Sequence, residues 1–278
     1  MNKIDTYLDR VTEGDCLEIM REFPEKCIDL ILCDLPYGIT ANEWDTIIDL
    51  PALWQQYKRI IKPNGVIALT AYSVFTAKLI LSNDEWFKYK IIWIKSKATN
   101  FLNAKKQPLR KHEDICIFYK NQPLYQPQML PGDPYNKGWR KDQETGCYGK
   151  YQPSLAKSNG GRYPYDVVCY NEDVPDWFYC KTAEHEDIGQ FHPTQKPVDL
   201  GRFIIRTFTL PGQIVLDNAS GSGSFLISAI MENRRFIGIE KNKDVFYKKI
   251  HPVDFVAISN ERIRRARLDQ QEKLFSGY

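Results

Sequence analysis

Short runs of apolar and β-branched residues alternate with helically periodic stretches along most of this chain. The pattern predicts buried strands at residues 28–33, 66–71, 89–94, 114–119, 213–216 and 235–239. It predicts helices at residues 53–61, 73–81, 198–208, 224–232 and 254–274. Strands joined through helices form right-handed crossovers, which build a mainly parallel sheet covered by helices on both faces. The sequence therefore predicts a doubly wound α/β fold.

One long segment breaks this alternation. Residues 121–161 have little periodicity and are rich in Gly, Pro, Tyr and Lys. An irregular segment of that length inside a compact domain is more often functional than a simple connection. We therefore divide the chain into a first half-domain at residues 1–120, an insertion at 121–165 and a second half-domain at 166–278 that ends in a helix.

Composition excludes several classes of protein. The seven Cys show no CxxC pair and no regular spacing with the four His, which argues against a zinc site and a disulfide framework. The first ten residues are polar, unlike a signal peptide, and no segment has the roughly 18 consecutive apolar residues that cross a bilayer. We expect a cytoplasmic protein without a metal centre or a membrane partner.

A glycine-containing turn follows the predicted strand that ends at Asp217. The turn carries Gly221 and Gly223 and leads into a helix, so a ligand can approach the backbone closely. Glu240 follows roughly 20 positions later, the spacing at which a carboxylate binds ribose hydroxyls in nucleotide-binding folds. The turn matches neither GxGxxG nor a phosphate-binding GK[ST] loop. The alternative is a tight turn with a surface glutamate.

A second motif, from Asp34 to Tyr37, follows the first predicted strand. The lone pair of an exocyclic amino group is delocalised into its base, so the amine is a poor nucleophile. The Asp34 carboxylate and the Leu35 carbonyl could accept the two amine hydrogens, while Pro36 stiffens the loop. Tyr37 could then stack on a base extruded from the duplex. The alternative is an ordinary turn.

The two motifs in this order resemble the amino-methyltransferases of the permuted beta class, the adenine-N6 and cytosine-N4 DNA methylases. In that family the catalytic motif comes first, the target-recognition region second and the cofactor motif last. Residues 14–17 resemble the segment that contacts the cofactor's adenine, and residues 192–197 resemble the family's His-Pro-Thr-Gln-Lys-Pro segment at the methionine end. Residues 111–115 resemble a strand start typical of the family.

The resemblance implies a Rossmann-like, circularly permuted methyltransferase fold with S-adenosyl-L-methionine as cofactor. It implies that Asp34, Leu35, Pro36 and Tyr37 form the catalytic loop. The cofactor contacts that it implies are Asp15, Cys16, Asp34, His192, Thr194, Lys196, Asp217, Gly221, Gly223 and Glu240. The chain departs from the family where Leu35 replaces the usual Pro and Ala219 the usual Phe, which leaves weaker cofactor binding as an alternative.

Two basic, aromatic segments are candidates for contacting DNA, since the net charge of only +3 requires local patches. Residues 95–111 contain six Lys or Arg and no acid, and the predicted phosphate-contacting loop consists of Lys97, Phe101, Lys105, Lys106 and Arg110. In the insertion, the predicted base-reading residues include Lys137, Arg140 and Lys141. The arginines at 262, 264, 265 and 267 are expected on a solvated face of the last helix.

The resulting hypothesis is a bacterial or phage-encoded, site-specific DNA methyltransferase that flips an adenine out of duplex DNA and methylates its amino group. Asp34 favours adenine, because the family usually has Asp or Asn there for adenine and Ser for cytosine. A cytosine-N4 enzyme, a catalytically inactive DNA-binding relative, and methylation of RNA or a protein amide stay open. Family analogy suggests a homodimer and a cognate restriction endonuclease.

Overall fold

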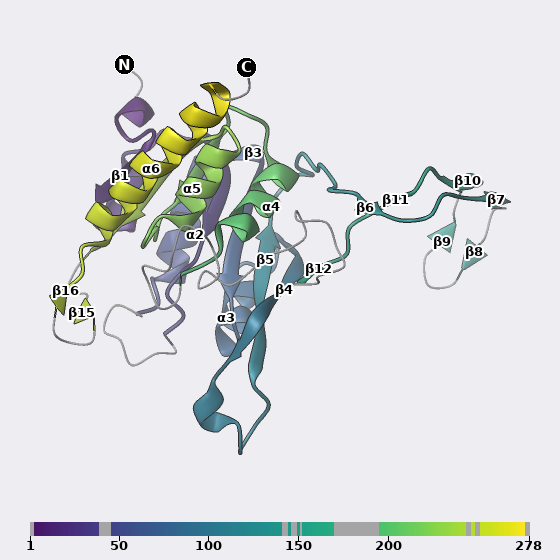
Figure 1. Ribbon diagram of the computed structural model, residues 1–278, viewed down its shortest axis with the longest axis horizontal. Helices are drawn as coiled ribbons and strands as arrows, with labels where there is room; N and C mark the ends of the chain where they lie inside the picture. Colours follow the sequence, from purple (N-terminus) through teal and green to yellow (C-terminus); the bar gives the residue numbers. More distant parts are fainter. Residues whose placement is uncertain are drawn as a thin grey trace. The chain divides into compact units, whose positions relative to one another are not determined.

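The computed structural model describes residues 3–38, 46–140, 144–145, 149–150, 152–169, 195–242, 246–247 and 251–275. The chain divides into two compact units (Figure 1). The larger unit comprises Met1–Tyr125 with Asp166–Tyr278, and the smaller comprises Gln126–Tyr165. In the described part of the chain, no helix combines the length and apolar character that crossing a membrane requires.

An eight-stranded sheet forms the centre of the larger unit. Its order is β1-β14-β13-β2-β3-β5-β4-β12. The strands span Arg10–Glu13 (β1), Arg235–Glu240 (β14), Ile214–Asp217 (β13), Ile28–Cys33 (β2), Ile61–Ala71 (β3), Arg110–Phe118 (β5), Phe87–Thr99 (β4) and Val167–Cys169 (β12). Strand β5 is antiparallel to both its neighbours, while the other pairings are parallel. The predicted doubly wound, mainly parallel sheet is confirmed.

Helices cover both faces of this sheet (Figure 1). One face carries α1 (Cys16–Arg21), α2 (Leu50–Ile60) and α3 (Val74–Leu81). The other carries α4 (Val198–Phe208), α5 (Ser224–Met231) and α6 (Phe255–Phe275), which pack side by side. The larger unit also contains two 3-10 helices, η1 (Lys3–Thr6) and η2 (Phe101–Asn103), and the small hairpin of β15 (Phe246–Tyr247) and β16 (His251–Pro252).

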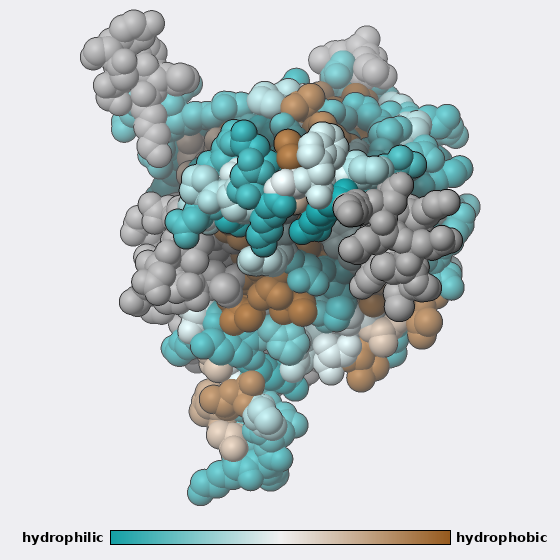
Figure 2. Space-filling model, turned by 90° about the vertical axis from the view of Figure 1, so that its right-hand side faces the viewer, coloured by the Kyte–Doolittle hydropathy of each residue, from teal (hydrophilic) through white to brown (hydrophobic). Residues whose placement is uncertain are grey.

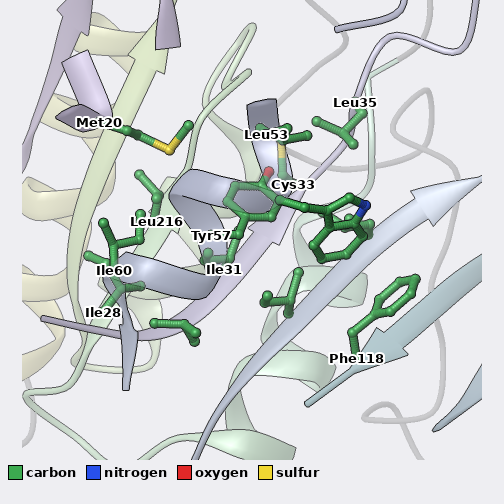
Figure 3. Packing of buried hydrophobic residues seen from close by; sticks show 14 of the residues in the cluster. Met20, Ile28, Ile31, Cys33, Leu35, Leu53, Tyr57, Ile60, Phe118 and Leu216 are labelled. Atoms are coloured by element: carbon green, nitrogen blue, oxygen red, sulfur yellow. The ribbon is translucent and has the colours of Figure 1, made fainter. Parts of the chain in front are cut away.

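A large hydrophobic cluster of the core lies between the sheet and the helices α1, α2 and α3 (Figure 3). Helix α2 buries Leu53, Tyr57 and Ile60 at helical spacing against β2 and β13. The helix begins at Asp49, whose carboxylate accepts the Ala52 amide at 3.0 Å and so satisfies an otherwise unpaired donor. Every residue of β2 is buried, as expected for a parallel strand covered on both faces. This strand therefore presents Asp34 from a rigid position.

Residues 62–65, whose Lys-Pro-Asn-Gly sequence is typical of a turn, lie inside strand β3. Ile28 pairs with Ile61 and Leu30 with Val66, so residues 62–65 bulge out of the ladder. Gly65 permits the bulge, because a Cβ at that position would lie 2.9 Å from the Asp29 carbonyl oxygen. Sequence periodicity did not predict β1, β12 or α1, because these elements are too short to show a periodic pattern.

In its described residues, the smaller unit contains three short antiparallel pairs of strands. Its strands are β6 (Leu130–Pro131), β7 (Tyr135–Arg140), β8 (Glu144–Thr145), β9 (Gly149–Lys150), β10 (Ser154–Ser158) and β11 (Gly161–Arg162). Strand β7 pairs with β10, β6 with β11 and β8 with β9. The unit begins at Gln126, whereas the sequence division placed the start of the insertion at residue 121.

Candidate active site

The two chemistry-bearing motifs meet at one edge of the sheet. Strands β13 and β2 are parallel neighbours, with Val215 opposite Leu30 and Leu216 opposite Ile31. Their carboxyl ends therefore place Asp217 beside Cys33, whose thiol hydrogen-bonds to the Asp217 carboxyl group. Ligands of open parallel sheets bind at this edge. The structure thus joins segments that lie far apart in the sequence.

Among the described residues, three side chains contact the Asp34 carboxylate. The Tyr37 hydroxyl donates to Asp34 Oδ1 at 2.8 Å and lies 2.9 Å from Thr70 Oγ1. The Thr70 hydroxyl also donates to Asp34 Oδ1. Lys196 Nζ lies 2.8 Å from the second oxygen, Oδ2. Thr70, which is buried in β3, was not predicted as a site residue, because a threonine in an apolar strand carries no signal of its own.

The Tyr37 ring is held parallel to a second aromatic ring. It stacks on Phe75 of α3 with centroids 5.2 Å apart and an interplanar angle of 26°. Lys196 Nζ lies 5.4 Å from the centroid of Tyr37. Burial, with Asp34 and Glu113 nearby, raises the pKa of Tyr37 well above its ordinary value, so its hydroxyl stays protonated. Leu35 buries its side chain in the core, which leaves its backbone at the edge of the sheet.

Lys196 links two carboxylates inside the protein. The residue is 8% exposed, and its Nζ lies 3.1 Å from Glu113 Oε2 as well as 2.8 Å from Asp34 Oδ2. The other Glu113 oxygen, Oε1, lies 3.2 Å from Lys95 Nζ. Burial alone would lower the pKa of Lys196, but Asp34 and Glu113 raise it above its ordinary value. Lys196 is therefore a permanent cation beside Asp34.

The two glycines of the turn have different surroundings. Gly221 has a φ of 48°, and a Cβ there would meet no atom of the described residues within 4 Å, so this backbone borders open space in that part of the structure. Its amide donates to Glu240 Oε2 at 2.7 Å. Gly223 has a φ of 81°, and a Cβ there would overlap Ser259 of α6. Gly221 therefore leaves room for a ligand, whereas Gly223 permits close packing of α6.

Arg262 of α6 holds the turn from behind. It is 3% exposed, and its NH1 donates to the Ser222 carbonyl at 2.5 Å and to Ser222 Oγ at 3.0 Å. The expected solvated position of Arg262 is wrong, because the buried carbonyl of the turn requires a donor. Ser222 Oγ also donates to Gln195 Oε1 at 3.2 Å, which connects the turn to the segment that carries Lys196.

Polar groups around the turn suit a polar ligand such as a nucleoside. Ser220 Oγ is buried and has no hydrogen-bond partner among the described residues, although buried polar groups are normally paired. Tyr57 donates to Asn218 Oδ1 at 2.5 Å, and the Asn218 side chain also contacts the Cys16 thiol. Asp217 is buried beside them, and its burial raises its pKa to about 8. These residues fit a ligand with sugar and amino groups.

Strand pairing brings two further residues, Asp15 and Glu240, to the same edge. Strands β1 and β14 are parallel, and the Gly14 amide donates to the Glu240 carbonyl at 2.9 Å. Asp15 caps α1 by accepting the Leu17 amide at 2.9 Å, and it lies 3.3 Å from Lys241 Nζ. Among the other predicted site residues, His192, Thr194 and Lys141 lie outside the described residues.

The predicted phosphate-contacting residues lie on the hairpin between β4 and β5. This hairpin extends from the sheet edge that carries Asp34, and Figure 2 shows hydrophobic and hydrophilic surface side by side on it. Phe101 and Leu102 in η2 are 75% and 84% exposed. Lys95, which belongs to this basic segment of the sequence, is buried against Glu113 instead. Arg110 lies over the Tyr72 ring, 5.0 Å from its centroid.

The remaining predicted DNA contacts belong to the smaller unit. Lys137 and Arg140 lie on β7, and Lys137 Nζ lies 5.3 Å from the centroid of Tyr135. Arg162 packs on the same ring, with its Cζ 4.8 Å from the centroid. Trp139 is exposed beside them. Strand pairing thus gathers basic and aromatic side chains in this unit.

Comparisons with known proteins agree with this arrangement. The sequence model of the DNA methylase family matches residues 28–250. The chain is 25% identical over 263 residues to the type II methyltransferase M.BglII of Bacillus subtilis, covering 86% of this chain and 67% of that one. It is 24% identical over 277 residues to the type II methyltransferase M2.MboI of Moraxella bovis, covering 87% of this chain and 89% of that one.

Solved structures share the fold at lower sequence identity. The M1.HpyAVI complex with S-adenosylmethionine is 20% identical, with a TM-score of 0.59 and coverage of 91% of this chain and 98% of that one. The cytosine-N4-specific PvuII DNA methyltransferase is 17% identical, with a TM-score of 0.55 and coverage of 91% and 92%. The predicted family is confirmed: because the family match spans residues 28–250, this chain belongs to the N6/N4 DNA methylase family.

Proposed function

We propose that this protein methylates the N6 amino group of an adenine in a specific duplex DNA site, and that Asp34 holds that amine. The observation that carries the proposal is the position of Asp34 at the end of β2, beside the glycine turn of β13. Its carboxylate is held by Tyr37, Thr70 and Lys196. A carboxylate fixed in this way is a preorganised acceptor for an amine.

The methyl donor is S-adenosyl-L-methionine, which M1.HpyAVI contains in its solved complex. When bound, it supplies an electrophilic methyl group on a positively charged sulfur. The open space at Gly221 and the Ser220 hydroxyl, which has no partner among the described residues, fit its nucleoside, and Glu240 would accept ribose hydroxyls. Asp15, Cys16, Asp217 and Lys196 complete the proposed cofactor contacts, together with Gly223, which shapes the turn. His192 and Thr194 remain part of the same proposal.

The catalytic loop handles the target amine in this proposal. One Asp34 oxygen and the Leu35 carbonyl accept the two amine hydrogens, so the nitrogen lone pair faces the methyl group. Burial of the Leu35 side chain fixes the position of that carbonyl, which explains how Leu replaces the family's usual Pro. A nitrogen–carbon bond forms as the carbon–sulfur bond breaks. Asp34 then accepts the proton that the methylated amine releases.

The Tyr37 ring provides the surface on which the flipped base stacks. The ring is already fixed by Phe75 and by its hydroxyl contacts with Asp34 and Thr70. Base flipping is part of the proposal, because an amine inside a base pair cannot reach a carboxylate that lies at the end of β2. The choice of adenine over cytosine rests on Asp34 as the first residue of the loop, and cytosine-N4 methylation is the second candidate.

Two surfaces are proposed to bind the duplex. The hairpin between β4 and β5 would contact phosphates through Lys97, Lys105, Lys106 and Arg110, with Phe101 available as a wedge. The smaller unit would read bases through Lys137, Arg140 and Lys141. A homodimer and a partner restriction endonuclease are part of the proposal, in keeping with the type II relatives.

The deciding experiment is transfer of labelled methyl groups to mixed-sequence duplex DNA, followed by nucleoside analysis. N6-methyl-2′-deoxyadenosine supports the proposal, and N4-methyl-2′-deoxycytidine supports the second candidate. Absence of transfer together with salt-sensitive DNA binding would mean an inactive DNA-binding relative. Mapping of modified bases in DNA from cells that express the chain would then give the recognised sequence.

A further inference from the structure

A chain of four alternating charges leads from Asp34 into the protein. It runs from Asp34 to Lys196 (2.8 Å), from Lys196 to Glu113 (3.1 Å) and from Glu113 to Lys95 (3.2 Å). The side chains of Lys196, Lys95 and Glu113 are 8%, 9% and 15% exposed. We call these four residues the charge chain. Two carboxylates and two ammonium groups make it neutral, which reduces the cost of burying it.

An incoming amine finds no free oxygen on the Asp34 carboxylate. Both Asp34 oxygens already have partners, since Oδ1 accepts from Tyr37 and Thr70 and Oδ2 faces Lys196. The amine needs one of these oxygens as an acceptor. Lys196 is the bulky competitor, because its ammonium occupies Oδ2 directly. An ammonium that leaves Asp34 without another carboxylate would be an unpaired buried charge, which is strongly unfavourable.

Glu113 provides that other carboxylate. Among the described residues, it is the second acid in contact with Lys196, and Oε2 lies only 3.1 Å from Nζ. Lys95 holds the opposite oxygen of Glu113 and itself contacts Thr99, which fixes the carboxylate from the far side. Lys196 can thus give up Asp34 Oδ2 and remain paired, and Glu113 does not have to move.

We propose that Glu113 is a positioning residue for methyl transfer: it keeps Lys196 paired when the amine takes Asp34, and it keeps the site from becoming net positive. This inference rests on the proposed role of Asp34. Charge matters here because the reaction brings a sulfonium near the amine, and reacting atoms must lie about 3–3.5 Å apart. Removing Glu113 would leave one surplus positive charge beside that cation.

The kinetic test uses Glu113→Gln, which removes the charge and keeps the shape. We expect single-turnover methyl transfer to slow by about 30-fold or more, with the DNA KM changed by less than about twofold. Glu113→Asp should recover most of the rate because it restores the carboxylate. An unchanged rate for Glu113→Gln in a folded, DNA-binding protein overturns the inference.

A neighbouring residue provides a matched control for purely structural effects. Asp114 follows Glu113 on β5, is buried, and pairs with Lys90 at 2.9 Å and Thr76 at 2.8 Å. Asp114→Asn should lower the thermal midpoint and leave the transfer rate nearly unchanged. If Asp114→Asn slows transfer as much as Glu113→Gln does, the slower transfer comes from a perturbed β5 and not from the charge chain, and the inference is overturned.

Calorimetric binding gives a readout that is independent of turnover. Glu113→Gln should lower the affinity for S-adenosylmethionine by about tenfold. The affinity for S-adenosylhomocysteine, whose sulfur is neutral, should fall by less than about twofold. Equal losses for the two ligands, or no loss for either, contradict the inference. A wild-type protein that transfers no methyl group would contradict the proposed function. The comparison of the two ligands would still test whether Glu113 balances the positive charge of the site.

Discussion

Lys196 Nζ lies 2.8 Å from Asp34 Oδ2, so a lysine from the second half of the chain neutralises the carboxylate that ends β2. Lys196 is buried, Asp34 is partly exposed, and the ion pair continues from Lys196 through Glu113 to Lys95. The Asp34 carboxylate therefore has a fixed orientation, and the Lys196 ammonium competes with the target amine for one of its oxygens. The expected effects of mutations at the site follow from this arrangement.

Asp34→Ala should abolish methyl transfer, with a loss of at least about 1,000-fold, because the amine loses its main acceptor. The glycine turn does not depend on Asp34, so binding of neutral S-adenosylhomocysteine should persist. Labelled transfer and calorimetry measure the two effects. Near-wild-type turnover in this variant would refute the assigned chemistry.

Thr70→Val should reduce the transfer rate by about tenfold, because the Asp34 carboxylate loses a hydroxyl that orients it. Valine has nearly the shape of threonine, and the position is buried in β3. Thr70→Ser restores the hydroxyl and should restore the rate. Single-turnover assays at saturating DNA decide the matter, and equal rates for the Val and Ser variants would rule out the orienting role.

Gly221→Ala and Gly223→Ala should have different main effects, one on cofactor affinity and the other on stability, although both positions have positive φ angles. Each alanine costs about 1–2 kcal/mol of backbone strain. At Gly221 the added Cβ enters the open space, so cofactor affinity should fall with a modest loss of stability.

At Gly223 the added Cβ overlaps Ser259, so the main effect should be a loss of stability. Ser259→Gly in the same protein should recover part of that stability, whereas it should not help Gly221→Ala. Thermal unfolding and calorimetry of the four variants provide the comparison. Identical profiles for Gly221→Ala and Gly223→Ala would show that the two glycines do not play separate roles.

Asp217 makes stability dependent on pH. Burial, with Asp34 and Glu240 nearby, raises the pKa of Asp217 from 3.8 to about 8. Between those values the folded state holds a proton that the unfolded state has released, so the free energy of unfolding falls as pH rises through this window. Asp217→Asn stays neutral and should not show this loss.

The measurement is the thermal midpoint of the ligand-free protein from about pH 5 to about pH 8.5. The midpoint of the Asn variant should increase relative to that of wild type across this range. Because the other titrating groups are common to both proteins, their contributions cancel in the difference. Parallel curves would mean that Asp217 is already ionised in the folded protein.

Lys105→Gln with Lys106→Gln should weaken DNA binding for all sequences alike. Each lost phosphate contact should reduce the slope of log affinity against log salt by about 0.9. Lys26→Gln is the control, because Lys26 is exposed just before β2, at the opposite edge of the sheet from Asp34. Equal salt slopes for the double variant and the control would exclude the hairpin from the DNA interface.

The sequence by itself determined most strands and helices of the larger unit and the order of the two motifs, and it is the basis for proposing the residues of the catalytic loop. Helix α4 lies at the predicted residues 198–208, and β2 at 28–33. These features are local: side-chain periodicity and strand ends are written within a few neighbouring residues. The family resemblance of the motifs came from the same short segments.

Only the tertiary structure decided which distant side chains meet. Residues 34, 113 and 196 carry no mark of their contacts in the sequence, and Arg262 resembled its exposed neighbours on α6. Lys95 resembled the other lysines of its segment, yet it is buried. Such pairings depend on which strands become neighbours in the sheet, and that order is set by burying every apolar face at once.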